Sequence, residues 1–281
     1  MKGRKGQILQ ALFVLPSFLG VAVFILCPFL DVVRRSFLSA VTEAWVGLLN
    51  YRTVFTNEAF LLAGKNTLRF IGVCIPLLLL ISLGIAIFLQ KQVHSSQVLK
   101  TAFLIPMVIP VCAVALLWKI FFHEQGLLNG ILHQFGIQGA DWLNGPTAFW
   151  VLVITYIWKN LGYNIVLWLA GLSAIPSNVY EAARVDGAGE WKCIAHITLP
   201  NLLPLFYMVT ILGFVNSFKV FREGYMVAGN YPHESMYLLQ HLFNNWYQNL
   251  DFNKMAAGAV VMALVIFAAI VVLHRMWDHE S

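Results

Sequence analysis

Residues 181–200 read EAARVDGAGEWKCIAHITLP, and this charged stretch interrupts a chain that is otherwise largely apolar. Residues 181–185 favour a helix, whereas the glycines at 187 and 189 weaken a helix interior by about 1 kcal/mol each. Residues 191–197 can form a second short helix, and Pro200 suits the first turn of the next one, where its missing N–H is not needed. The stretch therefore predicts a helix, a bend, a short helix and then a return to an apolar segment.

The composition around this stretch indicates an integral membrane protein. The 281 residues are 59% hydrophobic and 11% charged, whereas soluble domains carry roughly 25% charged residues. The net charge of +5 forms no basic stripe beyond the N-terminal tip, so nucleic-acid binding is not expected. The four cysteines are far apart and form no CxxC pair or Cys/His cluster. They are interpreted as small buried hydrophobes.

Six apolar runs are close to the roughly 20 residues that a helix needs to cross a ~30 Å hydrocarbon core. Their lengths and their lack of period-2 alternation exclude a β-barrel. The first run is too long for a signal peptide and has no cleavage site behind it. We therefore predict an all-α polytopic membrane protein forming one domain, residues 1–281. The expected spans are about 10–33, 69–90, 101–121, 148–173, 202–221 and 255–273.

An even number of spans places both termini on one side of the membrane, but counting basic residues does not choose the side. With the N-terminus inside, the inner segments hold Lys2, Arg4, Lys5, Lys91, Lys100, Arg184, Lys192 and Arg275, and the outer ones Arg34, Arg35, Arg52, Lys65, Arg69, Arg222 and Lys254. The basic N-terminal tip favours the cytoplasm because the first helix usually dominates orientation. Residues 174–201 would then form the longest cytoplasmic connection.

The chain shows no motif for catalysis or for using chemical energy. It lacks a G-x-x-x-x-G-K-[ST] phosphate loop, an HExxH pair and a G-x-S-x-G elbow. No polar cluster has the spacing of a nucleophile or a metal site. We expect no enzymatic activity, no catalytic residue, no metal and no cofactor in this chain. Any ATP and magnesium would be bound by a separate subunit.

The spacing E-A-A-x-x-D-G-A followed by I-x-L-P resembles the EAA loop of binding-protein-dependent ABC importer permeases. The matching residues are Glu181, Ala182, Ala183, Asp186, Gly187, Ala188, Ile197, Leu199 and Pro200. Further marks of that family are Asn50-Tyr51, Asn66-Thr67-Leu68, residues 103–106 (FLIP), and residues 170–172 (AGL) with Ile175-Pro176. The chain looks most like the upstream, F-type subunit of the carbohydrate permeases of the maltose and glycerol-phosphate group. It carries Lys100 for a common arginine, and its departure from the family at residues 226–235 leaves the subfamily, and hence the sugar, open.

The resemblance implies the transmembrane subunit of an ATP-driven carbohydrate importer. Its EAA loop would lie in the cytoplasm and dock on an ATPase, with Glu181 and Gly187 as central contacts and Ala182, Ala183, Asp186, Ile197, Leu199 and Pro200 completing the coupling motif. The implied partners are a homologous second permease, two ATP-binding cassette subunits, an external solute-binding protein and membrane lipid. The implied location is the cell membrane, with multiple passes and both termini cytoplasmic.

Polar residues within the spans have two interpretations. They are costly in lipid and face either a cavity or other helices. Lys159, Asn160, Tyr163 and Asn164 lie in the fourth span, and Asn216 and Lys219 in the fifth. Amides and a tyrosine suit sugar hydroxyls, so Asn160, Tyr163, Asn164, Asn216 and Lys219 are candidates for a substrate pathway. The alternative is that they hold the bundle together, and Lys159 could pair structurally.

Two rivals come from other classes of protein. An ion-coupled secondary transporter of a small polar solute would want paired acids near the midplane, and the central parts of the predicted spans contain none. A scaffold or sensor that transports nothing is the second rival.

Prolines at 16, 28, 76, 106 and 110 predict points at which the helices bend.

Overall fold

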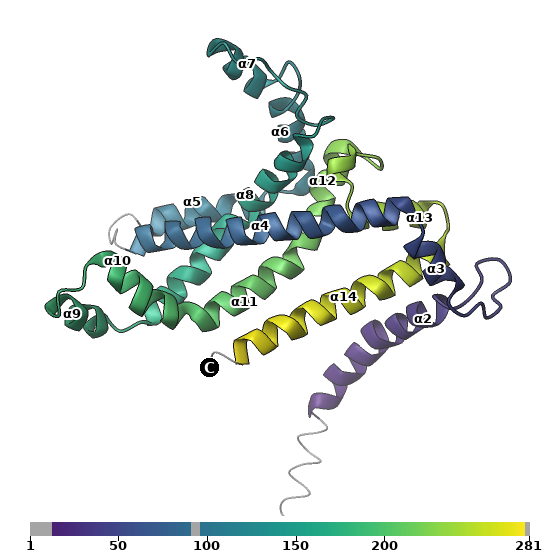
Figure 1. Cartoon of the computed structure of the whole chain (residues 1–281), viewed down its shortest axis with the longest axis horizontal. Helices are drawn as coiled ribbons and strands as arrows, with labels where there is room; N and C mark the ends of the chain where they lie inside the picture. Colours follow the sequence, from purple (N-terminus) through teal and green to yellow (C-terminus); the bar gives the residue numbers. More distant parts are fainter. Residues whose placement is uncertain (1–12, 91–95, 279–281) are drawn as a thin grey trace, which may run out of the picture. The chain divides into compact units, whose positions relative to one another are not determined.

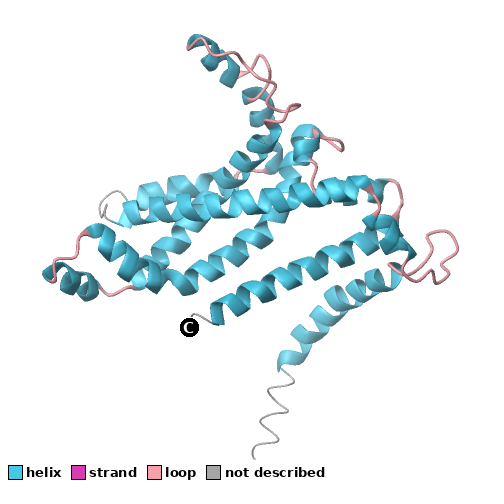
Figure 2. Ribbon diagram, viewed as in Figure 1, coloured by secondary structure: helices cyan, strands magenta, loops and turns pink. Residues whose placement is uncertain are grey.

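The computed structural model describes residues 13–90 and 96–278. The basic N-terminal tip, the start of the first predicted span and Lys91 lie outside these residues. Within the described part the chain is nearly all helical and has no strand (Figure 2), apart from an isolated antiparallel bridge between Leu38 and Trp45. The all-α class predicted from the sequence is confirmed.

The described residues group into two compact units. One comprises Met1–Leu61 with Phe243–Val271, and the other comprises Leu62–Leu242 with Val272–Ser281. The boundaries fall inside the continuous helices α4 (Glu58–Gln90), α13 (Leu239–Gln248) and α14 (Phe252–Asp278). Boundaries between domains ordinarily fall in exposed linkers, so the single permease domain stays a prediction.

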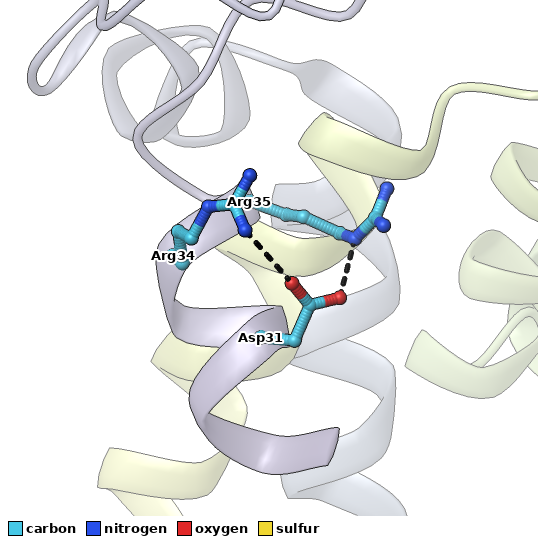
Figure 3. Close-up of polar contacts among 3 residues, drawn as sticks. All are labelled: Asp31, Arg34 and Arg35. Carbon is cyan, nitrogen blue, oxygen red and sulfur yellow. Dashed lines mark hydrogen bonds and ion pairs between the residues drawn. The ribbon is translucent and has the colours of Figure 1, made fainter. Parts of the chain in front are cut away.

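The first unit contains a helix over Phe13–Arg35, which ends in α2 (Cys27–Arg35), and the short helix α3 (Leu49–Phe55). A π-helical segment, η1 (Ala22–Leu26), lies just before Pro28, whose missing N–H leaves one carbonyl without its usual donor. At the end of α2, Arg35 Nε donates to Asp31 Oδ2 at 2.7 Å and Arg34 lies 3.7 Å from the same carboxylate (Figure 3).

The Asn50-Tyr51 pair secures the loop that follows α2. Asn50 Nδ2 donates to the carbonyl oxygens of Ser36 and Leu38 at 2.9 and 2.8 Å. The Tyr51 hydroxyl is 2.7 Å from Ser36 Oγ. These contacts help to satisfy the backbone carbonyls of the loop, which gives this family mark a structural role.

The second unit contains most of the remaining helices (Figure 1). In chain order they are most of α4, α5 (Ser96–Val108), α6 (Val111–Phe121), α7 (Leu127–Gln134), α8 (Ala148–Ala174), α9 (Ser177–Val185), α10 (Glu190–Cys193), η2 (Ile194–Thr198), α11 (Leu199–Ser217), η3 (Phe218–Val220), α12 (Phe221–Ala228), η4 (Glu234–Met236) and the start of α13.

Helix α8 is central to this unit and contacts helices on several sides. Trp168 Nε1 donates to Ser82 Oγ of α4 at 2.9 Å, and Gln90 Nε2 donates to the Leu172 carbonyl at 3.2 Å. The Tyr156 hydroxyl donates to the Gly213 carbonyl of α11 at 2.6 Å. A buried cluster joins these helices: Phe70, Cys74, Leu78, Ala148, Phe149, Leu152, Val153, Tyr156, Val220, Met236 and Leu238.

The contacts also fix the directions of three helices. Arg69 lies over the Phe149 ring near the start of both α4 and α8, and Gln90 meets Leu172 near the end of both. These two helices are therefore parallel. Trp168, late in α8, packs on Phe206, early in α11, so α11 is antiparallel to α8. These are the directions expected for the second, fourth and fifth spans.

The Asn66-Thr67 pair near the start of α4 holds the segment before α13. Asn66 Nδ2 donates to the carbonyls of Glu234 and Tyr237, and Thr67 Oγ1 accepts from the Leu239 N–H at 3.1 Å. The segment after α12 therefore lies at the same end of the unit as the starts of α4 and α8. The predicted topology likewise places residues 222–254 and these helix starts on one side.

Four described helices are long and apolar enough to cross a membrane: Phe13–Arg35, Glu58–Gln90, Glu190–Ala228 and Phe252–Arg275. A fifth crossing results if Thr101–Val108 and Val111–Phe121 are taken together. Helix α8 has 27 residues, but Lys159, Asn160 and Asn164 lower its hydropathy. With α8 the helices are consistent with the six predicted spans.

The third predicted span, 101–121, differs from the single helix that was expected. Its two parts meet at an angle of 96°. Pro110 lies at the junction in an extended conformation, with φ −57° and ψ 143°. A proline disfavours helical geometry in the residue before it and cannot donate a backbone hydrogen bond. The bend is therefore much sharper than an apolar run alone suggests.

Candidate functional site: a coupling loop and a polar pocket

The coupling loop, which we define as residues 181–200, begins within an unusually exposed helix. Helix α9 starts after Pro176 and contains no buried residue. Val185 is 88% exposed at its end, and Trp191, just beyond, is 84% exposed. Large apolar side chains displayed next to charged ones are a common mark of a protein-interaction surface.

Gly187 ends α9 in a way that depends on its lack of a side chain. Its φ is +79°, in the left-handed region that favours glycine. The Gly187 N–H donates to the Arg184 carbonyl at 3.1 Å, and the Ala188 N–H donates to the Ala183 carbonyl at 2.9 Å. These two bonds form a Schellman motif. The bend predicted at this glycine is thus a defined helix cap.

The second short helix predicted at 191–197 is not separate from the next long helix. The chain is helical without a break from Glu190 to Ala228. The segment η2 (Ile194–Thr198) is π-helical and comes directly before Pro200, which cannot donate a backbone hydrogen bond. The coupling loop is therefore joined to α11 by continuous helix.

The structure divides the predicted coupling residues into two groups. Glu181, Ala182, Ala183, Asp186 and Gly187 lie on α9 and its cap; all are exposed except Ala183, which is half-buried. Ile197 lies in η2, whereas Leu199 and Pro200 begin α11. The Tyr180 hydroxyl lies 2.9 Å from Thr198 Oγ1 and connects the two groups.

A groove of about 540 Å³ lies beside α9 at the end of α4. Gln90, Glu181 and Arg184 line the groove, together with the buried residues Cys193 and Thr198. Glu181 and Arg184 also belong to the exposed helix α9. That arrangement suits the docking of another protein.

The polar pocket is a second cavity, of about 260 Å³, between α8 and the segment that links α11 to α12. Lys159 Nζ lies 2.6 Å from Glu223 Oε1, and these side chains are only 15% and 9% exposed. Lys219 Nζ donates to Asn216 Oδ1 at 2.7 Å. The complete lining is Met107, Val111, Thr155, Tyr156, Lys159, Asn160, Asn216, Lys219, Val220, Arg222 and Glu223.

The structure brings together three of the five predicted pathway residues: Asn160, Asn216 and Lys219 line the polar pocket. Tyr163 and Asn164 do not line it. Asn164 is buried and its Nδ2 donates to the Asn160 carbonyl at 2.9 Å, one turn earlier in the same helix, so this bond joins it to no other helix.

Sequence reasoning missed Glu223 and Arg222 as lining residues, because both follow the predicted end of the fifth span. A signal was present. Lys159 lies in an apolar run, the fourth predicted span, and needs a counter-charge. Glu223 is the first acidic residue after the fifth predicted span.

The fold and these two sites define a class of protein: a helical membrane protein with an exposed helix and a polar pocket. Residues 66–279 match the family of binding-protein-dependent transport system inner membrane components. The chain belongs to this family.

Similar proteins include three permeases. The chain is 32% identical to the arabinooligosaccharides transport system permease AraP of Bacillus subtilis, over 93% of this chain and 85% of that one. It is 31% identical to the sulfoquinovosyl glycerol transport system permease SmoG of Agrobacterium fabrum, over 91% and 86%. It is also 31% identical to the trehalose/maltose transport system permease MalF of Thermococcus litoralis, over 93% and 90%.

The fold resembles a chain of a bacterial ABC transporter involved in the import of the acidic polysaccharide alginate. The TM-score is 0.86 at 23% identity, covering 99% of this chain and 98% of that one. A second structure of the alginate transporter, in complex with an alginate pentasaccharide-bound periplasmic protein, gives 0.84 at 22% identity, over 98% and 96%. The chain is thus an inner-membrane transport component with several spanning helices, and not an enzyme.

Proposed function

We propose that this chain is the transmembrane subunit of an ATP-driven importer of a mono- or oligosaccharide. The observation that carries the proposal is the exposed helix α9 with its glycine cap, at the positions of the EAA motif. Membership of the transport family and the sugar-transporting relatives support the same function.

The coupling loop would act as a lever between an ATPase and the membrane. A subunit docked on Glu181, Ala182, Asp186 and Gly187 would pull on α9. Because α9 is bonded to η2 through Tyr180 and Thr198, and η2 continues into α11, the motion would pass to a spanning helix. This use of a partner's energy explains why the chain needs no phosphate loop, and ATP and magnesium belong to the partner.

The partners in the proposal are a homologous second permease, two ATP-binding cassette subunits and an external solute-binding protein, all working in membrane lipid. Each permease forms half of the translocation pathway. In this chain we assign that half to the polar pocket, with Asn160, Asn216 and Lys219 facing substrate and Tyr163 and Asn164 supporting them. Both termini lie in the cytoplasm, on the side of the coupling loop.

The function is tested by co-purifying the subunits and measuring ATP hydrolysis in liposomes. The wild-type chain should retain an ATPase subunit, and hydrolysis should rise when the sugar-loaded binding protein is added. Glu181→Lys reverses the charge of the exposed face of α9 and should release the ATPase subunit.

The matched control is Glu124→Lys, which makes the same charge reversal at an exposed residue after α6. It should retain the ATPase. If Glu181→Lys keeps the subunit as firmly as the control does, the coupling role is wrong. If no candidate binding protein stimulates hydrolysis, the chain is a scaffold or sensor instead.

A further inference from the structure

The polar pocket has an unbalanced set of charges. Lys159, Lys219 and Arg222 line it with a single acidic residue, Glu223. Glu223 is already ion-paired with Lys159, because its Oε1 lies 2.6 Å from Lys159 Nζ and both side chains are mostly buried. Two positive charges are therefore left without an acidic partner among the described residues.

The two remaining cations point to a ligand through their surroundings. Within residues 13–90 and 96–278, the hydrogen bond of Lys219 Nζ goes to a neutral group, Asn216 Oδ1. Arg222 has no hydrogen bond or ion pair in the part of the chain that the structure describes. Asn216, Lys219 and Glu223 have helical i, i+3 and i+7 spacing, which places them on one face. Lys219 thus shares a helix face with the acid that neutralises Lys159, and Arg222, next to that acid in the chain, also lines the pocket.

The four charged residues of the pocket differ in burial. Lys159 lies near the middle of the 27-residue helix α8, where uncompensated charge is costly and usually serves transport. Lys159 and Glu223 are mostly buried, whereas Lys219 and Arg222 are exposed and so are accessible to a ligand that enters the pocket. A neutral sugar can accept hydrogen bonds from these cations, but a carboxylate gains charge-assisted hydrogen bonds in addition.

The other lining groups suit a hydroxylated ligand. Asn160 Nδ2 donates to the Tyr156 carbonyl, which leaves the amide oxygen of Asn160 able to accept a hydrogen bond. Asn216 uses its oxygen for Lys219 and keeps its N–H donors. The volume of about 260 Å³ lies just below the range of roughly 300–1,000 Å³ that is usual for small-molecule sites, so it suits one sugar unit at a time.

We infer that the polar pocket selects a carbohydrate unit that carries a carboxylate, as in a uronic acid. Arg222 and Lys219 bind the carboxylate, Arg222 through its planar pair of N–H groups, and Asn160 and Asn216 bind hydroxyls. The inference rests on the proposed function, since it names the substrate class of that importer.

The test measures uptake into liposomes that contain the complete transporter and ATP. The probes are uronate disaccharides of the gluco, galacto and manno series, each beside the neutral disaccharide with hydroxymethyl groups in place of the carboxylates. At least one uronate should enter faster than its neutral counterpart. Lys219→Gln/Arg222→Gln should lower uptake of that uronate by about tenfold or more, and should lower neutral uptake by a clearly smaller factor, because a neutral sugar loses hydrogen-bond donors but no ion pair.

The matched control is Arg52→Gln/Lys65→Gln, which removes the same charge from two exposed residues outside the pocket. It should change neither uptake rate by more than about twofold. Import of neutral disaccharides alone, or equal losses of both probes in the pocket variant, would overturn the inference and leave the sugar importer standing. Failure to import any of these disaccharides would overturn the inference, whereas the proposed function is overturned by its own test, in which no sugar-loaded binding protein stimulates ATP hydrolysis.

Discussion

The ion pair between Lys159 and Glu223 joins residues that are 64 positions apart in the chain. Each charge makes the other tolerable in a poorly hydrated place. The pair also bears on ion coupling. From the sequence, the lack of acids in the central parts of the spans disfavours an ion-coupled transporter. With Glu223 buried opposite Lys159, ATP coupling rests on the coupling loop and the family, and not on a lack of acids.

Removing one member of this pair should destabilise the protein strongly. Lys159→Met leaves the Glu223 carboxylate buried without a partner, a change that ordinarily costs about 3–5 kcal/mol. Lys159→Met/Glu223→Met removes both charges and should recover most of the loss. Thermal unfolding of the purified transporter measures both effects.

A surface pair supplies the control for this prediction. Lys254 Nζ lies 2.7 Å from Asp251, and those side chains are 31% and 37% exposed. Such pairs contribute about 0–1 kcal/mol, so Lys254→Met should shift the unfolding temperature little. A loss in Lys159→Met no larger than that control would show that the pair is not buried in the assembled protein.

Gly187 makes a second prediction at the scale of the residue. A β-branched residue at φ +79° is strained by roughly 1–2 kcal/mol, whereas asparagine tolerates this region better. Gly187→Val should therefore weaken retention of the ATPase subunit more than Gly187→Asn, as judged by co-purification. Gly189→Ala is the control because Gly189 has φ −72°. Equal losses in Val and Asn variants would point to direct contact with the partner rather than to backbone conformation.

At the scale of the element, prolines shape the spanning helices in two ways. Pro110 separates α5 from α6 with a bend of 96°, whereas Pro200 follows a π-helical segment and leaves the helix continuous. Close packing between helices keeps these bent helices in position. A side chain at Gly162 of α8 would collide with the backbone of Phe103 in α5, so glycine there lets the two helices approach each other.

The start of α13 carries a buried histidine that predicts a dependence of stability on pH. His241 is fully buried, and its Nδ1 accepts the Leu238 N–H at 3.2 Å. Burial lowers the pKa of His241 from 6.5 to about 4. Between these values the unfolded chain binds more protons than the folded one, so the free energy of unfolding falls as the pH falls. The lowered pKa of His241 contributes about 3 kcal/mol to the free energy of unfolding. This contribution is fully present above pH 6.5.

Thermal unfolding of the purified transporter between pH 4 and pH 7.5 measures this effect. In His241→Asn the unfolding temperature should depend less steeply on pH over that range. His133→Asn, which changes an exposed histidine of α7, should keep the wild-type slope. The same slope in wild type and His241→Asn would show that His241 is not the group responsible.

At the scale of the whole molecule, the sequence predicts the helices that a lipid environment requires. It does not predict features that depend on tertiary contacts. Long apolar runs must be helical because lipid offers the backbone no partners, and the helices of the structure follow those runs. The fourth span was recognised despite its polar residues because its apolar flanks persist. The contact of Lys159 with Glu223 and the π-helical turn before Pro200 depend on packing and local backbone geometry that no periodicity records.

The orientation of the transporter is the last prediction. Helices α4 and α8 are parallel and α11 is antiparallel to them, so α9 and the segment after α12 lie at opposite ends of the second unit. If α9 meets an ATPase in the cytoplasm, the segment after α12 must face outward. In a chain without its native cysteines, Tyr231→Cys should react with a membrane-impermeant maleimide in intact cells, because Tyr231 is 75% exposed.

Asn178→Cys on α9, which is also exposed, should react only after the membrane is permeabilised or in inside-out vesicles. The two positions control for each other, since both are accessible in the folded chain and differ in the side they face. Labelling of Asn178→Cys in intact cells with protection of Tyr231→Cys would reverse the orientation. The exposed face of α9 could then not meet a cytoplasmic ATPase, and the lever that joins α9 to α11 would have nothing to drive it.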